Sequence, residues 1–118
     1  MISPDIWLSG LLSTIREIGD ESFQERVWLK GCGPEVSSYE EVMCRFFDDY
    51  AIENVIDVEW RALGLTVRQR EGLISLRDAL DIFGNSVRET PEPTTILSDP
   101  RWHSIRELAR NTLALWTI

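Results

Sequence analysis

The sequence predicts an all-α protein: a compact bundle of about five helices with no substantial sheet. Apolar residues recur at spacings of three and four along most of the chain, which is the period of an amphipathic helix. Helix-start residues precede these stretches, and no segment alternates with period two in a β-branched context. The 118 residues, of which 43% are hydrophobic, suffice for one core, so we expect residues 1–118 to form a single helical domain.

The first two predicted helices occupy the N-terminal quarter of the chain. Ser3 is a suitable N-cap and Pro4 a suitable first residue for a helix that ends near Gly19. Its apolar side contains Trp7, Leu8, Leu11, Leu12, Ile15 and Ile18. Asp20 can cap a second, shorter helix that extends to about residue 29. The inward-facing residues of that helix are Phe23, Val27 and Trp28.

A capping box formed by Ser38 and Glu41 opens the third predicted helix, which extends to about residue 50. Its apolar stripe contains Tyr39, Val42, Met43, Phe46, Phe47 and Tyr50. Residues 51–65 are less regular. There we expect Asp57 to cap a single helical turn that ends at Gly64.

The C-terminal half of the chain predicts one long helix, a loop and a final helix. Thr66 and Gln69 form a second capping box, which opens a helix that ends at Gly84. Its inward residues are Leu73, Leu76, Leu80 and Phe83. Residues 85–97 contain two prolines and few apolar groups, so we expect a loop.

The final predicted helix begins at Asp99, followed by proline, and runs to about Trp116. Its apolar side contains Trp102, Ile105, Leu108, Ala109, Thr112, Leu113 and Trp116. Its polar side contains His103, Arg106, Glu107 and Arg110. His103 is the only histidine, so the usual histidine-rich zinc sites are excluded, and we expect it to be exposed and without a catalytic role.

Charge is the most informative feature of this sequence. A net charge of −8 argues against a nucleic-acid or anionic-membrane partner, whose affinity depends on clustered positive charge. Eight acids lie in residues 35–59, here called the acidic segment, and are opposed only by Arg45. They are Glu35, Glu40, Glu41, Asp48, Asp49, Glu53, Asp57 and Glu59. The segment therefore carries −7, and we expect Arg45 to pair with the nearby Asp48 and Asp49.

The acidic segment has three possible meanings: a solvated face, a docking surface for a cationic protein, or a divalent-metal site. Asp49 and Glu53 are four residues apart and could share a helix face, but the segment lacks the ligand spacing and glycine of a calcium loop. We therefore predict no metal, no cofactor and no catalytic residue. A docking surface would use Glu40, Glu41, Asp48, Asp49, Glu53, Asp57 and Glu59, with Tyr39, Tyr50 or Trp60 as aromatic anchors where exposed.

The two cysteines, Cys32 and Cys44, are too few for a secreted disulfide scaffold, and we expect two reduced, inert thiols. The N-terminus has no basic region before its apolar stretch, so we expect no signal peptide. No apolar run approaches the roughly 20 residues that span a bilayer. These features predict a cytoplasmic protein.

Four short stretches stand in a distinctive order. They are residues 23–28 (FQERVW), 38–49 (from SY to FDD), 77–81 (RDALD) and 99–102 (DPRW). This order resembles a family of small, acidic, all-helical bacterial proteins, some of which are similar to immunity proteins of contact-dependent inhibition and related polymorphic toxin systems. The resemblance spans about residues 11–116, apart from 31–37 and 85–95. Asp48 and Asp49 match the family's paired acids.

The resemblance implies a protein that binds and neutralises a cognate, basic toxin domain and has no chemistry of its own. Toxins that cut nucleic acid tend to carry basic substrate clefts, where an acidic helix face can dock as a phosphate mimic. The oligomeric state stays open. Two alternatives also stay open: a helical adaptor or scaffold that self-associates through an exposed apolar patch, and a small enzyme with a carboxylate-bound metal.

Overall fold

The computed structural model describes residues 4–87 and 91–116, and these residues are mostly helical with no strand among them. The all-α prediction is therefore confirmed. The described residues contain seven α-helices rather than about five, because short helices also form at Ile52–Asn54 and Pro93–Ser98, where only a single turn and a loop were expected.

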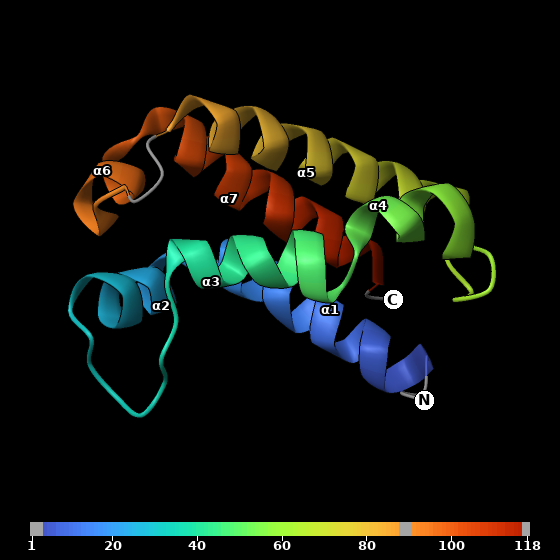
Figure 1. The fold of residues 1–118 in the computed structure, drawn as a ribbon, viewed down its shortest axis with the longest axis horizontal. Helices are drawn as coiled ribbons and strands as arrows, with labels where there is room; N and C mark the ends of the chain where they lie inside the picture. The colour runs from blue at the N-terminus through green and yellow to red at the C-terminus, as the bar shows by residue number, and fades with distance from the viewer. Residues whose placement is uncertain (1–3, 88–90, 117–118) are drawn as a thin grey trace.

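The longer helices form the body of the molecule (Figure 1). Helix α5 (Val67–Ser86) packs against α7 (Pro100–Leu113), and α7 also packs on α1 (Pro4–Ile18). Helix α3 (Tyr39–Cys44) lies beside α1. The core is continuous through all four helices, since residues buried from solvent come from each of them.

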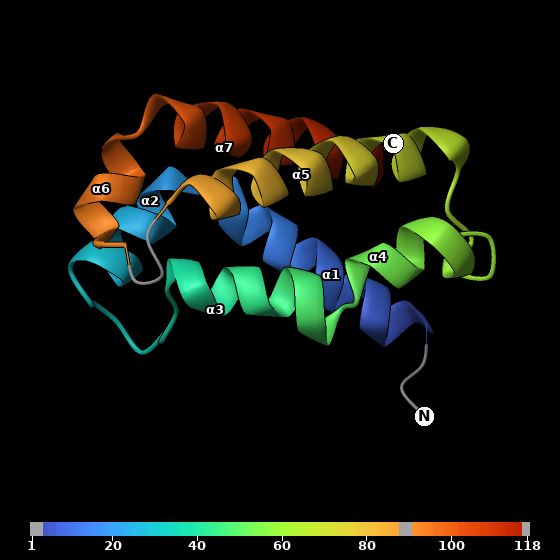
Figure 2. The same cartoon turned by 45° about the horizontal axis from the view of Figure 1, so that its top comes forward.

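The shorter helices lie at the two ends of the bundle (Figure 2). Helix α2 (Glu21–Phe23) and helix α6 (Pro93–Ser98) lie together at one end. Helix α4 (Ile52–Asn54) lies at the other end, where the chain passes from α3 to α5. A 3-10 turn, η4 (Ala114–Trp116), follows α7.

Helices α2, α3 and α4 continue directly into wider π-helical turns. These are η1 (Gln24–Leu29), η2 (Arg45–Asp49) and η3 (Val55–Glu59). At the end of η2, the backbone N–H of Tyr50 donates to the carbonyl of Arg45 over 2.9 Å, five residues back instead of four. The wider turn rotates each following side chain away from the position that an α-helical period predicts.

The predicted capping residues are largely confirmed. Backbone N–H groups donate to the side chains of Asp20, Ser38, Thr66 and Asp99. Thr66 and Gln69 form the full reciprocal box. Ser3 lies outside the described residues.

Gly84 does not end the helix that Thr66 opens, because α5 continues to Ser86. A Cβ at this position would lie 3.2 Å from Met43 Cε and 3.8 Å from the Tyr39 hydroxyl. The absence of a side chain at Gly84 therefore lets α5 approach α3 closely, and this glycine acts in helix packing rather than in capping.

The predicted loop over residues 85–97 is also corrected, because α6 begins at Pro93 within it. Proline is favourable at the first position of a helix, and Ile96 anchors this helix with complete burial. Two adjacent apolar residues in six, Ile96 and Leu97, are too weak a periodic signal to identify a helix this short.

Asp57 does not cap the turn in the acidic segment. The helical stretch starts five residues earlier, at Ile52, and Asp57 lies exposed inside η3. Gly64 is left-handed with φ of +76°, as expected for the residue that ends this region.

The start of α4 depends on an unusual residue, because Ala51 adopts the left-handed conformation with φ of 45° and ψ of 55°. This conformation is strained for any residue with a Cβ. We expect Ala51→Gly to raise the free energy of unfolding by about 1 kcal/mol, despite the greater freedom of glycine in the unfolded chain. Urea denaturation measures this change. Ala62→Gly, at an exposed turn residue whose φ is not positive, is the matched control and should not stabilise the protein.

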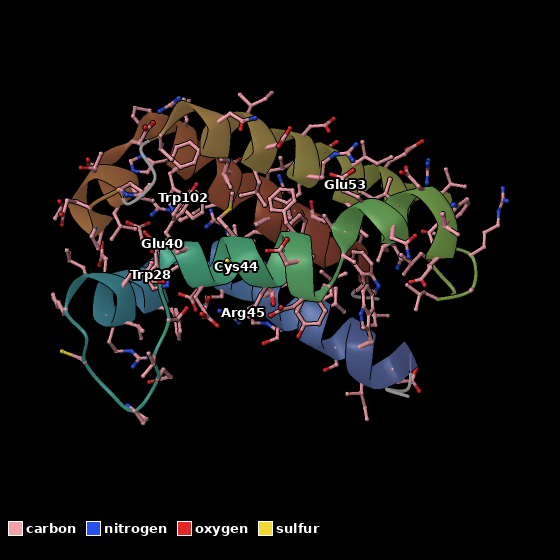
Figure 3. The ribbon with its side chains drawn as sticks, viewed as in Figure 1. Trp28, Glu40, Cys44, Arg45, Glu53 and Trp102 are labelled. Carbon is pink, nitrogen blue, oxygen red and sulfur yellow. The ribbon has the colours of Figure 1, made fainter. Side chains whose placement is uncertain are left out.

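A cluster of aromatic rings forms the part of the core where η1, α3, α5 and α7 meet. Trp102 is completely buried at its centre. Its ring centroid lies 5.4 to 5.8 Å from those of three neighbours, Trp28, Tyr39 and Phe83. Figure 3 labels Trp28 and Trp102, which lie toward the end of the molecule that contains α2 and α6.

Gln24 joins this cluster to the end of α1 and is itself completely buried. Its Nε2 donates to the carbonyls of Glu17 and Ile18, each over 2.8 Å, at the C-terminus of α1. Its Oε1 accepts from Trp102 Nε1 over 3.0 Å and from Arg106 over 3.4 Å. The side-chain amide of Gln24 therefore forms hydrogen bonds with polar groups of both α1 and α7.

Arg106 was expected on the polar side of the last helix and is instead buried, with 5% of its surface exposed. Its guanidinium contacts Gln24 and lies 3.6 Å from the Glu21 carboxylate. Arg110 donates to the carbonyl of Gly19 over 2.9 Å. Both cations lie near the C-terminus of α1, where the helix dipole favours positive charge.

Candidate docking surface

The acidic segment runs along one side of the molecule, over α3, η2, α4 and η3. Figure 3 labels Glu40, Cys44 and Glu53 along this side. All seven predicted docking carboxylates are exposed: Glu40, Glu41, Asp48, Asp49, Glu53, Asp57 and Glu59. The structure thus places these charges in solvent, where they are accessible to a partner.

Three acids of the segment have a basic neighbour. Glu35 forms two hydrogen bonds of 2.8 Å with Arg26. Glu53 Oε2 lies 2.6 Å from Arg77 Nη1, which ties α4 to α5. Glu41 lies 3.9 Å from Arg45 within the same helix. Each of these carboxylates is partly neutralised within the fold.

The other five acids form no ion pair with any residue in the described part of the chain. They are Glu40, Asp48, Asp49, Asp57 and Glu59, and are called here the unpaired carboxylates. They are the charges that remain fully available to a cationic partner.

Arg45 does not pair with Asp48 and Asp49 as expected. Its guanidinium extends toward α1, where it forms an ion pair of 2.5 Å with Glu17 and a 3.2 Å hydrogen bond with Ser37. The Glu17 carboxylate is only 11% exposed, so it binds the arginine in a partly desolvated position. As a result, the single cation of the acidic segment leaves its paired aspartates unneutralised.

Helix dipoles distinguish two groups among these charges. Glu40 and Glu41 lie in the first turn of α3, where the dipole favours negative charge, so they stabilise the helix. Asp48, Asp49 and Glu59 lie at the C-terminal ends of η2 and η3, where the dipole disfavours carboxylates. Folding gains nothing from these three charges, and this favours a role outside the fold.

The ion pair of Glu35 with Arg26 affects the pKa of the Glu35 carboxyl group. Hydrogen bonding to Arg26 is the main cause that lowers the pKa of Glu35 to about 2. A carboxylate whose pKa falls on folding adds stability above its unfolded pKa near 4.5, and that contribution is lost as the pH falls toward 2. We therefore expect the NMR titration midpoint of the Glu35 carboxyl group to lie near 2 and to return toward 4.5 in Arg26→Met. A midpoint near 4.5 in the unchanged protein would mean that the pair does not form in solution.

The three candidate aromatic anchors differ in their environments. Tyr39 is buried and cannot act as an anchor, and burial raises its pKa to about 12. Tyr50 is half-buried, with its ring edge against Trp7 at 5.6 Å and its hydroxyl against the backbone at Gly10. Trp60 is half-buried as well. Tyr50 and Trp60 thus keep part of their rings available for contact.

Trp60 is accompanied by two arginines that the sequence did not reveal as its partners. The guanidinium of Arg61 lies 4.6 Å from its ring centroid and that of Arg70 lies 5.3 Å away. Arg70 also donates to the carbonyl of Ile56 over 2.8 Å, which holds η3 against α5. Because of these two cations, the surface around Trp60 is less acidic than the rest of the acidic segment.

Asp49 and Glu53 do not share a helix face, because the left-handed Ala51 separates η2 from α4 between them. Among residues 4–87 and 91–116, no group of three or more histidine, cysteine, aspartate or glutamate side chains is arranged to hold a metal ion.

Cys32 and Cys44 are free and exposed. His103 is exposed, and its Nε2 lies 2.9 Å from the carbonyl of Leu97.

Comparisons with known proteins add no family to this description. The chain matches no family model, and no curated protein or solved structure is significantly similar to it. Within the described residues, no helix is both long enough and apolar enough to cross a membrane.

Proposed function

We propose that this chain is an immunity protein, which binds a cognate toxin domain through the acidic segment and neutralises it. The observation that carries the proposal is the set of five unpaired carboxylates on one side of the fold. Three of them occupy helix ends that disfavour negative charge, and Arg45, the basic residue nearest in sequence to Asp48 and Asp49, pairs with Glu17 instead. The resemblance of the sequence to immunity proteins points in the same direction.

The proposed mechanism is occlusion without catalysis. Focused negative charge speeds the encounter with a positively charged cleft and selects against partners of the wrong sign. Once docked, α3 and η3 would cover the cleft in the place of a phosphate backbone. Tyr50 and Trp60 would supply apolar contact at the edge of the charged region. A toxin that cuts nucleic acid would act in the cytoplasm, so the proposal includes a cytoplasmic location for this protein.

Cell growth tests this function directly. The toxin to be tested would be the C-terminal domain of a large secreted protein whose gene neighbours the gene of this chain, expressed from an inducible promoter. We expect co-expression of this chain to restore growth, and the two proteins to co-purify as a complex. Continued toxicity, with this chain present at a level equal to that of the toxin, would contradict the proposal.

A non-catalytic adaptor is the second candidate function. The observation that favours it is an exposed apolar hollow between α5 and α7, remote from the acidic segment. Loss of the unpaired carboxylates would leave adaptor binding through this hollow unchanged, which distinguishes the two candidates.

A further inference from the structure

The acidic segment ends at a basic and aromatic surface, here called the Trp60 corner, which consists of Trp60, Arg61 and Arg70. Trp60 directly follows η3, and part of its ring packs against the core while the rest stays exposed. The ring centroid lies 4.6 Å from the guanidinium carbon of Arg61 and 5.3 Å from that of Arg70. Arg70 comes from α5 and is fixed by the 2.8 Å hydrogen bond that its Nε donates to the carbonyl of Ile56. Contacts with two elements therefore hold the exposed part of the ring in place.

Neither arginine of the Trp60 corner forms an ion pair with a carboxylate in the described part of the chain, although acids are close in sequence. Arg61 lies two residues after Glu59 and four residues after Asp57, a spacing at which opposite charges on a helix attract each other. Unpaired charges of both signs therefore adjoin each other along residues 57–61. Such a surface is complementary to a partner whose positive cleft is bordered by negative charge.

Arg61 is well suited to bind a carboxylate of such a partner. Its side chain is exposed, and its guanidinium lies over the Trp60 ring, where the cation–π attraction restrains it. The planar group presents N–H donors in a fork that matches the two oxygens of a carboxylate. Because the ring already restrains this side chain, less conformational entropy is lost on binding than for a free surface arginine.

We infer that the Trp60 corner is a second contact region for the toxin domain, in which Arg61 binds a carboxylate at the border of the toxin's basic cleft. The inference rests on the proposed function and adds a property of the partner, which is an acidic residue beside its cleft. The unpaired carboxylates of this chain act at long range and set the association rate constant. The contacts of the Trp60 corner are short-range and set the dissociation rate constant.

Arg61→Gln tests this contact, because the contact predicts an effect opposite in sign to that of simple attraction. The variant changes the net charge from −8 to −9, since it removes one positive charge. Attraction to a basic cleft alone would then strengthen binding. We expect the complex with the toxin domain to dissociate about tenfold faster instead, because the partner carboxylate loses its donor. Stopped-flow fluorescence measures the rate constant, and circular dichroism confirms that the variant is folded.

Arg61→Glu determines the charge that the partner presents at the same place. If Arg61 faces a carboxylate, glutamate should accelerate dissociation more than glutamine does, because like charges then oppose each other. If the partner presents a cation there, glutamate would slow dissociation. Slower dissociation of Arg61→Glu, or a dissociation rate constant of Arg61→Gln equal to that of the unchanged protein, would overturn the inference.

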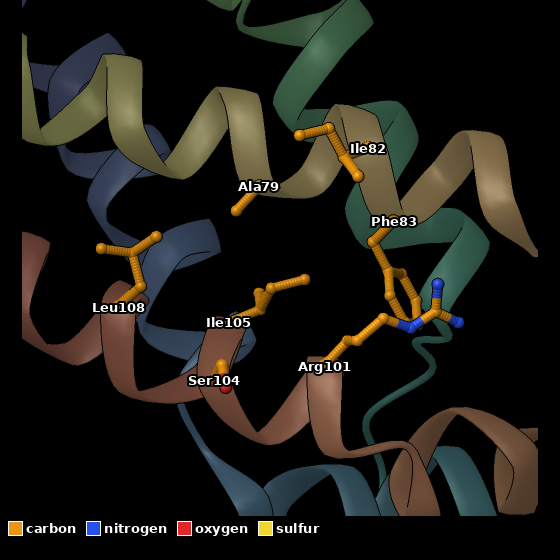
Figure 4. Close-up of a pocket in the computed structure, with 7 residues that line it drawn as sticks. All are labelled: Ala79, Ile82, Phe83, Arg101, Ser104, Ile105 and Leu108. Atoms are coloured by element: carbon orange, nitrogen blue, oxygen red, sulfur yellow. The ribbon is translucent and has the colours of Figure 1, made fainter.

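Two controls separate this contact from effects elsewhere on the surface. Arg16→Gln removes the same charge from an exposed position in the last turn of α1, next to α2, whereas α4 lies at the other end of the molecule (Figure 2). Ile82→Ser changes the exposed apolar edge of the hollow between α5 and α7 (Figure 4). Both controls should dissociate at a rate within about twofold of that of the unchanged protein. Equal acceleration by Arg61→Gln and either control would overturn the inference.

The free protein provides a test that does not require the toxin. Protons of the Arg61 side chain over the indole ring should resonate upfield of their usual positions in the NMR spectrum. Trp60→Leu, which keeps an apolar side chain against the core, should abolish this shift. Absence of the upfield shift in the unchanged protein would overturn the inference alone. Failure of the unchanged protein to form any complex with the toxin domain would overturn the proposed function together with the inference.

Discussion

Gln24→Leu is expected to lower the free energy of unfolding by about 3 kcal/mol, because it leaves several buried polar groups without partners. Leucine fills much of the same space but accepts and donates no hydrogen bond. Trp102 Nε1 loses its acceptor, and the carbonyls of Glu17 and Ile18 lose their donor. Urea denaturation measured by far-UV circular dichroism gives the change.

A double-mutant cycle with Trp102→Phe isolates the central hydrogen bond. Phenylalanine keeps an aromatic ring in the core but removes the Nε1 donor. We expect Trp102→Phe to cost less in the Gln24→Leu background than in the unchanged protein, by about 1 to 2 kcal/mol. Additive effects, or a loss below 1 kcal/mol for Gln24→Leu alone, would show that this hydrogen bond does not connect η1 to α7 in solution.

The largest functional effect is expected from neutralising four unpaired carboxylates together, in Asp48→Asn, Asp49→Asn, Asp57→Asn and Glu59→Gln. The rate constant for association with the toxin domain should fall about 10- to 100-fold at low salt, because these charges steer the encounter. The free protein should become slightly more stable, since three of the charges lie at unfavourable helix ends. Stopped-flow fluorescence measures the rate constant.

A second set of four substitutions provides a control with the same net charge. Glu25, Glu71, Asp81 and Glu107 are exposed and lie outside the acidic segment. Neutralising these four changes the net charge from −8 to −4, as the first set does, since each set removes four negative charges. We expect the control set to slow association less than threefold. Equal slowing by both sets would show that total charge, rather than the acidic segment, governs binding.

Local signals explain why most of the helices could be predicted from the sequence. Ser38, Thr66 and Asp99 precede their helices at the positions where the structure finds helix starts. Capping depends only on residues within one turn, so it is visible in a short window of sequence. The apolar stripes of the longer helices were predictable for a similar reason, because burial on one face imposes a repeat of 3.6 residues.

Features that depend on contacts between distant segments were not predictable. Arg106 has a polar position in the helical repeat, yet it is buried because Gln24, 82 residues away in the chain, accepts from it. Gly84 has the appearance of a helix stop, but it lies inside α5 because Met43 packs against it. The π-helical turns also shift the helix register, and no residue type marks where they begin.

The residues of the candidate docking surface could be predicted from the sequence, but the ion pairs that they form could not. The exposure of Asp48 and Asp49 follows from their position in the helical repeat. The ion pair between Arg45 and Glu17 joins residues 28 positions apart and determines that both aspartates stay unneutralised. The fold therefore supplies the information that separates the unpaired carboxylates from Glu35, Glu41 and Glu53.

The salt dependence of association between the unchanged protein and the toxin domain tests the role of the acidic segment most directly. We expect the logarithm of the rate constant to fall steeply with ionic strength, with at least a tenfold decrease between about 50 and 500 mM NaCl. The slope should flatten in the variant that neutralises Asp48, Asp49, Asp57 and Glu59. A rate constant that is independent of salt in the unchanged protein would contradict electrostatic docking and place the interface on an apolar face.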